Sequence, residues 1–169
     1  LLQQYNRALR QRNMLLKTLR EQPELRATLP VWNQQLANLG WKLMMYREAF
    51  CARLARLASD NHADISGGRE QLKVQYQPQC SAGDEASLLK AIEEGTAEDI
   101  RRLTSLRGPH RDEMALTLDG REIARIDLRN ECETVVAGTH TLIVEDGAIR
   151  VEDAPCRDQI CVRHAPVHR

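Results

Sequence analysis

The sequence predicts an α+β protein with an antiparallel helical hairpin at its N-terminus, then a small α/β part, then a small all-β module. Three observations indicate this class. Apolar residues recur at helical spacing up to Leu57, strict alternation of apolar and polar residues dominates beyond Met114, and no helical period follows residue 113. Helices that precede strands along the chain are typical of α+β folds or of two separate modules.

The first helix is expected from residue 2 to about residue 19. Its apolar positions keep a rhythm of three and four residues, although polar Arg12 or Asn13 fills one place in it. Pro23 and Pro30 then mark a connection to the next element. The apolar positions of this first stripe are Leu2, Tyr5, Leu9, Leu16 and Leu19.

A longer helix follows and is expected to end at Gly67-Gly68. Its apolar stripe continues for about seven turns, and we interpret it as core rather than as a cofactor site. Because the connection is short, the two helices should pack stripe against stripe as an antiparallel hairpin. The stripe consists of Trp32, Leu36, Leu39, Leu43, Tyr46, Phe50, Leu54 and Leu57.

Residues 71–77 alternate in polarity and predict a strand. Asp84 or Ser81 is placed to cap the helix after it. That helix is expected to stop at Gly95, and a second is expected to start at Thr96 with a capping-box-like Asp99.

Two β-hairpins are predicted in the last third of the chain. Residues 114–128 alternate on both sides of Asp119-Gly120, and residues 139–154 repeat this pattern around Asp146-Gly147. An Asp-Gly pair between alternating runs is a strong local signal for a two-residue hairpin turn.

The chain has no net charge, but the charge is unevenly spread. Residues 1–60 hold ten basic and four acidic residues, a net +6, which leaves −6 for the remainder. A basic N-terminal part is typical either of a surface for an anionic partner or of a solvated helix face. We expect no membrane span and no signal peptide, and the start at Leu1 suggests a piece of a longer gene.

Five cysteines at scattered positions do not form a disulfide framework, so a cytoplasmic setting is expected. Cys156 and Cys161 are expected to pack as a pair in a β fold, either reduced or disulfide-bonded. With His164 and His168 they form a formal Cys2His2 set, but its spacing is too compact for a zinc finger, so no metal is expected.

Four segments follow one another in a characteristic order and spacing: YNRALRQRNMLLK, VWNQQLANLGWKLMMYREAF, ISGGREQLKVQYQ and TSLRGPHRDEMALTLDG. Together they resemble the middle of the RecF family, recombination-mediator ATPases related to SMC proteins. The resemblance covers residues 1 to about 120 and implies the helical arm of that family with its return into the ATPase head.

The resemblance implies a role in recombinational DNA repair and replication, with double-stranded DNA and the RecF-type head or repair proteins as partners. The P-loop pattern GxxxxGK[ST] is missing, as are the family's Ser-x-Gly-Gln signature and Walker B carboxylate. We therefore expect this chain not to be an enzyme. ATP and Mg²⁺ are expected only in a full-length RecF-like protein, and no cofactor is expected here.

The last part resembles a different family, the NusG domain II type, through the segment Val151–Val162 with its two cysteines. This second resemblance covers roughly residues 113–169 and implies an all-β module that is incomplete at its end. We therefore divide the chain into an arm at 1–112 and a β module at 113–169, with a boundary uncertain by about ten residues. A natural fusion, an engineered graft and a misassembled gene would all produce such a join.

The densest polar cluster is Gly108-Pro109-His110-Arg111-Asp112, where a Gly-Pro turn with His and Arg fits phosphate binding, coupling to the ATP site, or a local ion pair that holds the turn. We expect no stacking of single-stranded bases, because no aromatic residue interleaves the arginines. The candidate DNA or phosphate contacts are Arg7, Arg10, Arg12, Arg53, His110 and Arg111.

These expectations combine into a non-catalytic part of a RecF-like repair protein that binds double-stranded DNA and contacts the head. The alternatives are a NusG domain II-like module for protein interaction or transcription, carried on a helical hairpin, and an artificial fusion without a function as a unit.

Overall fold

The computed structural model describes residues 1–129, 132–137, 140–145 and 148–153. The chain forms two compact units, each built from two separate stretches. One contains residues 1–50 and 78–112, and the other contains residues 51–77 and 113–169. The long helix α2 (Leu29–Ser66) contributes to both units. The division into 1–112 and 113–169 stays a prediction.

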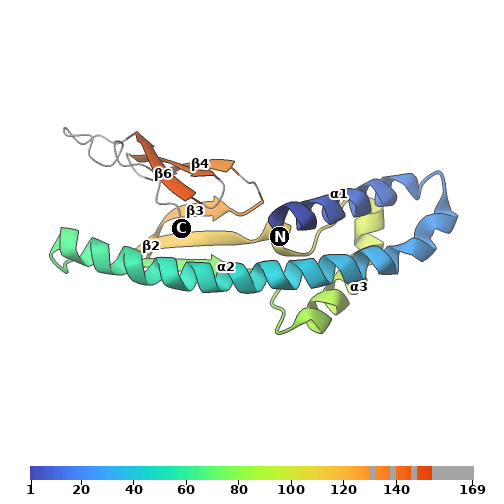
Figure 1. Ribbon diagram of the computed structural model, residues 1–169, viewed down its shortest axis with the longest axis horizontal. Helices are drawn as coiled ribbons and strands as arrows, with labels where there is room; N and C mark the ends of the chain where they lie inside the picture. The colour runs from blue at the N-terminus through green and yellow to red at the C-terminus, as the bar shows by residue number, and fades with distance from the viewer. Residues whose placement is uncertain (130–131, 138–139, 146–147, 154–169) are drawn as a thin grey trace. The chain divides into compact units, whose positions relative to one another are not determined.

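The first unit is helical and contains the expected antiparallel hairpin. Helix α1 (Leu2–Thr18) is followed by the 3₁₀ helix η1 (Pro23–Thr28), and the chain then returns along α1 as the first part of α2 (Figure 1). Both prolines lie where a missing N–H does no harm, Pro23 at the start of η1 and Pro30 in the first turn of α2. The sequence prediction of an α+β fold with an N-terminal helical hairpin is therefore confirmed.

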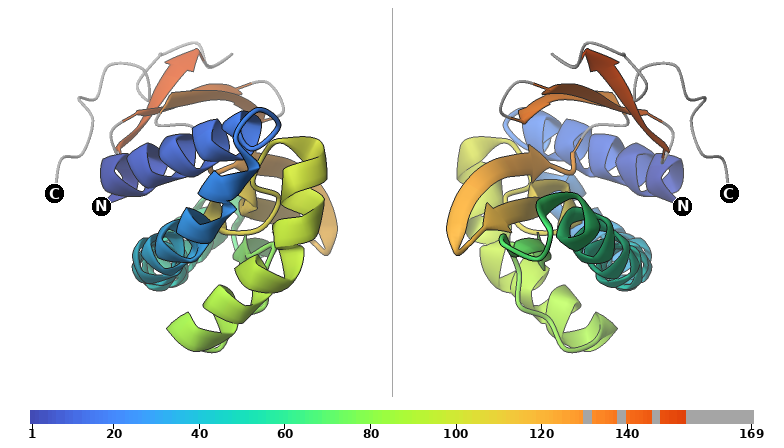
Figure 2. Two further views of the ribbon diagram at one scale, coloured as in Figure 1. Left: turned by 90° about the vertical axis from the view of Figure 1, so that its right-hand side faces the viewer. Right: turned by 90° about the vertical axis from the view of Figure 1, so that its left-hand side faces the viewer.

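Helix α3 (Glu85–Arg102) crosses α2 and completes the core of this unit (Figures 1 and 2). Asp84 caps it, since its carboxylate accepts the Ser87 N–H at 2.7 Å while the Ser87 hydroxyl accepts the Asp84 N–H at 3.0 Å. The larger apolar cluster buried by the three helices consists of Tyr5, Ala8, Leu36, Ala37, Leu43, Met44, Leu88 and Ile92.

Two expectations about these helices were wrong. The chain does not break at Gly95, because one continuous helix runs through it. The apolar stripe of α2 is also not core throughout: Leu36 and Leu43 are buried, whereas Tyr46 is 67% exposed and Leu57 is 55% exposed. Periodicity shows which residues share a face, but it does not show how far along that face another element extends.

The second unit contains the three-stranded antiparallel sheet β1-β2-β3, formed by Leu72–Gln77, Glu113–Leu118 and Arg121–Asp127. The strand expected at 71–77 and the hairpin at Asp119-Gly120 are confirmed. Asp119 and Gly120 have φ of 49° and 81°, which is the backbone of a type I′ turn. Cys51, near the middle of α2, packs with Val74, Met114 and Ile126 of this sheet.

A second antiparallel sheet consists of β4 (Cys132–Ala137), β5 (His140–Glu145) and β6 (Ala148–Asp153) in that order. The strands expected around Asp146-Gly147 are therefore present. That turn, Cys156, Cys161, His164 and His168 all lie outside the described residues. In the described part of the chain, no helix is long and apolar enough to cross a membrane.

Candidate nucleic-acid interface

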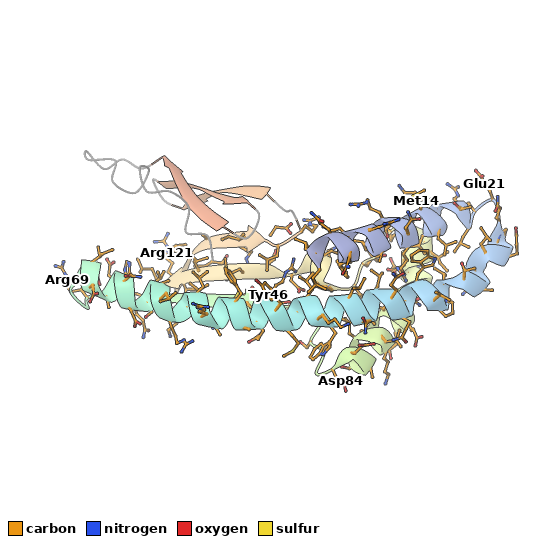
Figure 3. All side chains as sticks on the ribbon, viewed as in Figure 1. Met14, Glu21, Tyr46, Arg69, Asp84 and Arg121 are labelled. Atoms are coloured by element: carbon orange, nitrogen blue, oxygen red, sulfur yellow. The ribbon has the colours of Figure 1, made fainter. Side chains whose placement is uncertain are left out.

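The outward face of α1 carries a row of basic side chains. Arg7, Arg10 and Lys17 are exposed on the side opposite to the buried residues, and Arg20 just beyond the helix is exposed as well. Met14, on the same face, is 61% exposed and projects away from α2 (Figure 3). Helix α1 contains no acidic residue, and none of these four basic residues forms an ion pair with another described residue. We call Arg7, Arg10, Lys17 and Arg20 the basic row.

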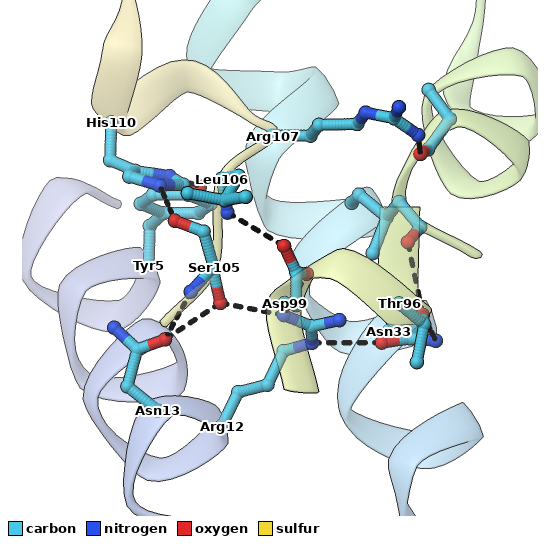
Figure 4. Close-up of polar contacts among 12 residues, drawn as sticks. Tyr5, Arg12, Asn13, Asn33, Thr96, Asp99, Ser105, Leu106, Arg107 and His110 are labelled. Atoms are coloured by element: carbon cyan, nitrogen blue, oxygen red, sulfur yellow. Dashed lines mark hydrogen bonds and ion pairs between the residues drawn. The ribbon is translucent and has the colours of Figure 1, made fainter. Parts of the chain in front are cut away.

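Arg12 points the other way and is completely buried. Its Nη1 donates to Asp99 Oδ2 and to the Ser105 hydroxyl, each at 2.7 Å, and its Nε donates to Asn33 Oδ1 at 2.9 Å (Figure 4). The expectation that Arg12 contacts a phosphate is therefore wrong in this structure, because the side chain is enclosed and already paired. It joins α1 to α2, to α3 and to the chain that follows α3.

This polar core also holds the segment that leaves α3. The other oxygen of Asp99 accepts the Leu106 N–H at 2.9 Å, and Asn13 Oδ1 accepts both the N–H and the hydroxyl of Ser105 at 2.8 Å. Leu103, directly after α3, has a left-handed backbone with φ of 56°. Long-range hydrogen bonds thus fix the backbone between α3 and the Gly-Pro motif.

His110 is likewise buried and is not available to a phosphate, which corrects a second expectation. Its Nε2 lies 3.0 Å from the carbonyl oxygen of Ser105, and its Nδ1 lies 2.8 Å from the Tyr5 hydroxyl (Figure 4). A carbonyl oxygen only accepts, so Nε2 carries the proton. In the neutral ring, Nδ1 then accepts from Tyr5. Burial raises the pKa of Tyr5 far above its usual value, which keeps this hydroxyl protonated.

The Gly-Pro pair fits tightly against the helices. Gly108 has φ of 127°, and a Cβ there would lie 2.8 Å from the Tyr5 hydroxyl. Pro109 packs on Gly40 of α2, where an added Cβ would meet the proline ring at 3.2 Å. Arg47 of α2 donates to the Pro109 carbonyl oxygen and lies 3.6 Å from the buried carboxylate of Asp112. The motif is therefore held by α1 and α2 together.

The other candidate DNA or phosphate contacts are not buried as Arg12 and His110 are. Arg7 and Arg10 belong to the basic row, and Arg53 is exposed on the part of α2 that belongs to the second unit. Arg111 is partly exposed, and its Nε is buried without a hydrogen-bond partner among the described residues. Its ion pair with Asp112 is not formed; Asp112 pairs with Arg47 instead. The described residues contain no group of ligands for a metal ion.

Sequence reasoning missed Lys17 and Arg20 as members of the basic row. The signal was available, because Arg7, Arg10 and Lys17 follow one another at helical spacing on the side away from the apolar stripe. It also missed Asp99 and Ser105, whose partners on α1 lie 87 and 93 residues away along the chain. No local pattern identifies pairs of that kind.

Comparison with known proteins identifies relatives that match most of the chain. The chain is 38% identical over 136 residues to the DNA replication and repair protein RecF of Agathobacter rectalis, which covers 79% of this chain and 36% of that protein. It is 42% identical over 125 residues to RecF of Gloeobacter violaceus, covering 70% of this chain and 33% of that protein. The chain thus spans about a third of the length of these curated relatives.

Solved structures show the same fold. A structure of the recombination mediator protein RecF with ATP in the RecFOR pathway matches 72% of this chain and 34% of that chain, with a TM-score of 0.65 at 24% identity. In addition, the family model of NusG domain II matches residues 103–169, from ten residues before the predicted start of the β module. Most of the chain is thus homologous to RecF, and its C-terminal part matches NusG domain II.

Proposed function

We propose that this RecF-like chain is a DNA-binding, non-catalytic part of a DNA replication and repair protein, and that the basic row of α1 contacts double-stranded DNA. The observation that carries the proposal is the division of charge on α1. Arg12 faces inward and is neutralised by Asp99, while Arg7, Arg10, Lys17 and Arg20 face outward without acidic partners among the described residues. Similarity to RecF supports the repair role.

The spacing of the row suits a polyanion. At 1.5 Å per residue, Arg7 and Lys17 lie about 15 Å apart along the helix. Duplex DNA presents one negative charge per roughly 1.7 Å of its axis, so several phosphates fall within that length. Contacts of this kind position a protein on DNA without reading its sequence, and they weaken as salt rises.

The same proposal assigns the segment Gly108–Asp112 to contact with the ATPase head that full-length RecF-like proteins possess. Rigid attachment to α1 and α2 supports this role, because a fixed segment can transmit the position of the arm. Arg111 is the member whose side chain is partly exposed and whose Nε lacks a partner among the described residues. Arg111→Ala should weaken binding of a separately produced RecF head domain, measured by calorimetry, without changing stability by more than about 0.5 kcal/mol.

We also propose that the chain does not hydrolyse ATP. A P-loop cradles phosphates with backbone N–H groups and a lysine, and no segment here has that pattern. Incubation with ATP and Mg²⁺ should release no more phosphate than a protein-free blank, whether or not duplex DNA is added. Release that scales with protein and persists through purification would contradict this proposal.

The DNA proposal is tested by the fluorescence anisotropy of a labelled blunt-ended duplex. Wild type should bind with a Kd on the order of 10⁻⁴ to 10⁻⁶ M at moderate salt. The variant Arg7→Gln/Arg10→Gln/Lys17→Gln should lose most of this affinity. The matched control is Arg101→Gln/Arg102→Gln on α3, where both arginines are exposed but pair with Glu98. Equal losses in both variants would indicate only a general charge effect and would contradict the proposed surface.

The second candidate function is protein interaction through the C-terminal part, which the match of residues 103–169 to NusG domain II favours. A surface of that kind should retain its partner at high salt, because apolar contacts are not screened. Binding of a protein partner that persists at high salt and after neutralisation of the basic row would favour protein interaction over DNA binding.

A further inference from the structure

A groove runs between α1 and the N-terminal part of α2. It has a volume of about 660 Å³, within the range of small-ligand sites. Its lining combines apolar residues, amides and one guanidinium, and none of the lining residues is acidic. The residues are Gln4, Arg7, Ala8 and Gln11 of α1 with Trp32, Gln35 and Leu39 of α2.

We propose that this groove binds a single unpaired nucleotide, with its base against Trp32 and its phosphate at Arg7. The proposal rests on the proposed function, because Arg7 belongs to both the groove and the basic row. A nucleotide that enters the groove would thus remain connected to a backbone that follows Arg10 and Lys17. The ligand class is single-stranded nucleic acid, or an unpaired position beside a duplex.

The lining offers each contact that a nucleotide needs. Trp32 is partly exposed, and the face of an indole ring stacks on any base. Gln4, Gln11 and Gln35 each bring both a donor and an acceptor, which is the combination that base edges require. The guanidinium of Arg7 suits a phosphate because its planar donors match two oxygens at once. The lack of carboxylates in the lining disfavours a basic peptide.

The packed helices change the expectation that bases would not stack. The sequence places no aromatic residue among the arginines of α1, but the antiparallel hairpin brings Trp32 into the same groove as Arg7, 25 positions earlier in the chain. The aromatic platform comes from the other helix and is visible only once the two helices are packed.

Tryptophan fluorescence tests the proposal directly. The chain has two tryptophans, Trp32 and Trp41, so the variant Trp41→Phe leaves Trp32 as the single reporter. Short oligothymidylate should quench this emission in a saturable manner, and a blunt-ended duplex should quench it much less. Unchanged Trp32 emission at oligothymidylate concentrations that saturate binding would overturn the proposal.

Substitution of the platform supplies a second readout. Trp32→Leu should weaken the affinity for labelled oligothymidylate about tenfold, the expected loss of one stacked base, whereas Trp32→Phe should retain most of it. Equal losses in both variants, or no loss in either, would contradict stacking. Circular dichroism of each variant confirms that the helices remain folded.

The failure of this inference is distinguishable from failure of the proposed function. Arg10→Gln/Lys17→Gln should weaken duplex binding and raise the oligothymidylate concentration needed for quenching, while the quenching of Trp32 at saturation stays unchanged. Duplex binding without quenching would overturn the groove alone. Quenching without any duplex binding would overturn the duplex surface and with it the connection between the two sites.

Discussion

At the scale of single residues, Arg12 shows most clearly what a sequence pattern can and cannot reveal. The apolar rhythm of the first helix places Arg12 or Asn13 in a core position, and the structure puts Arg12 there, fully buried. The pattern does not reveal that Asp99 pairs with it, because that partner lies 87 residues away. A buried arginine without a partner is too costly to keep, so a pattern that does not show Asp99 cannot tell a buried Arg12 from an exposed DNA contact.

Asp99→Ala should therefore destabilise the protein by about 3–5 kcal/mol, because it leaves a buried guanidinium without its counter-charge. Glu98→Ala is the matched control on the preceding residue of α3, since Glu98 pairs with exposed arginines and its loss should cost no more than about 1 kcal/mol. Urea denaturation monitored by circular dichroism measures both. The double variant Arg12→Leu/Asp99→Leu should be less destabilised than Asp99→Ala, and the reverse order would refute this account of the pair.

Tyr5→Phe should lower the free energy of unfolding by about 1–3 kcal/mol, because Nδ1 of buried His110 loses its donor. The size of this loss should change with pH in the alkaline range. Burial raises the pKa of Tyr5 above that of the unfolded chain, so between the two values the unfolded state binds fewer protons than the folded state. Stability from Tyr5 is thus complete below about pH 10 and falls as the pH rises further.

The difference in stability between wild type and Tyr5→Phe should accordingly shrink above about pH 10. Urea denaturation on both sides of that pH measures it, with Tyr46 and Tyr76 present in both proteins as a common background. A constant difference across this range would show that the folded-state pKa of Tyr5 is not raised.

At the scale of elements, local signals predicted more than distant ones. The end of α2 before Gly67 and the Asp119-Gly120 turn depend on residues within a few positions and were predicted from the sequence. Asp84 was one of the two residues predicted to cap α3. The break at Gly95 was predicted from an equally local signal, but it was wrong. Arg107 packs where a side chain of Gly95 would stand and donates to the Ala91 carbonyl at 2.8 Å, so this glycine serves packing rather than termination.

Whether Gly95→Ala raises or lowers the free energy of unfolding therefore depends on Arg107. Alanine favours a helix over glycine by about 1 kcal/mol, but its Cβ would lie 2.9 Å from Nη1 of Arg107. The substitution should destabilise wild type by about 1 kcal/mol and stabilise the Arg107→Ala variant by a similar amount. Thermal and urea denaturation of wild type, the two single variants and the double variant measure these changes. If Gly95→Ala changed stability in the same direction with and without Arg107, the packing explanation would be ruled out.

Gly108→Ala should be more damaging, by about 2–5 kcal/mol, because a side chain there is strained at φ of 127° and would lie 2.8 Å from the Tyr5 hydroxyl. Gly67→Ala serves as its control. It also has a positive φ, 64°, but nothing lies within 4 Å of its added Cβ, so the cost should remain near 1–2 kcal/mol. Equal costs in urea denaturation would mean that the contact with Tyr5 contributes nothing.

At the scale of the whole molecule, the sequence was sufficient to recognise both the RecF-like and the NusG domain II-like parts. The sequence was not sufficient to locate the proposed DNA-binding surface. Whether the basic residues form an interface or a solvated helix face depends on which arginines are buried. Packing of α1 buries Arg12 and removes it from the possible DNA contacts. Lys17, in contrast, already shares a helical face with Arg7 and Arg10 in the sequence. The grouping of residues 51–77 with those after 112 likewise follows from strand pairing between β1 and β2.

The salt dependence of duplex binding tests the central claim most directly. The logarithm of the binding constant should fall with the logarithm of salt concentration by about 0.9 per phosphate contact, so three or four contacts give a slope of roughly −3 to −4. Neutralising Arg7, Arg10 and Lys17 together should reduce the slope by close to three. A slope that is unchanged in that variant would show that DNA binds elsewhere and would contradict the assignment of the basic row.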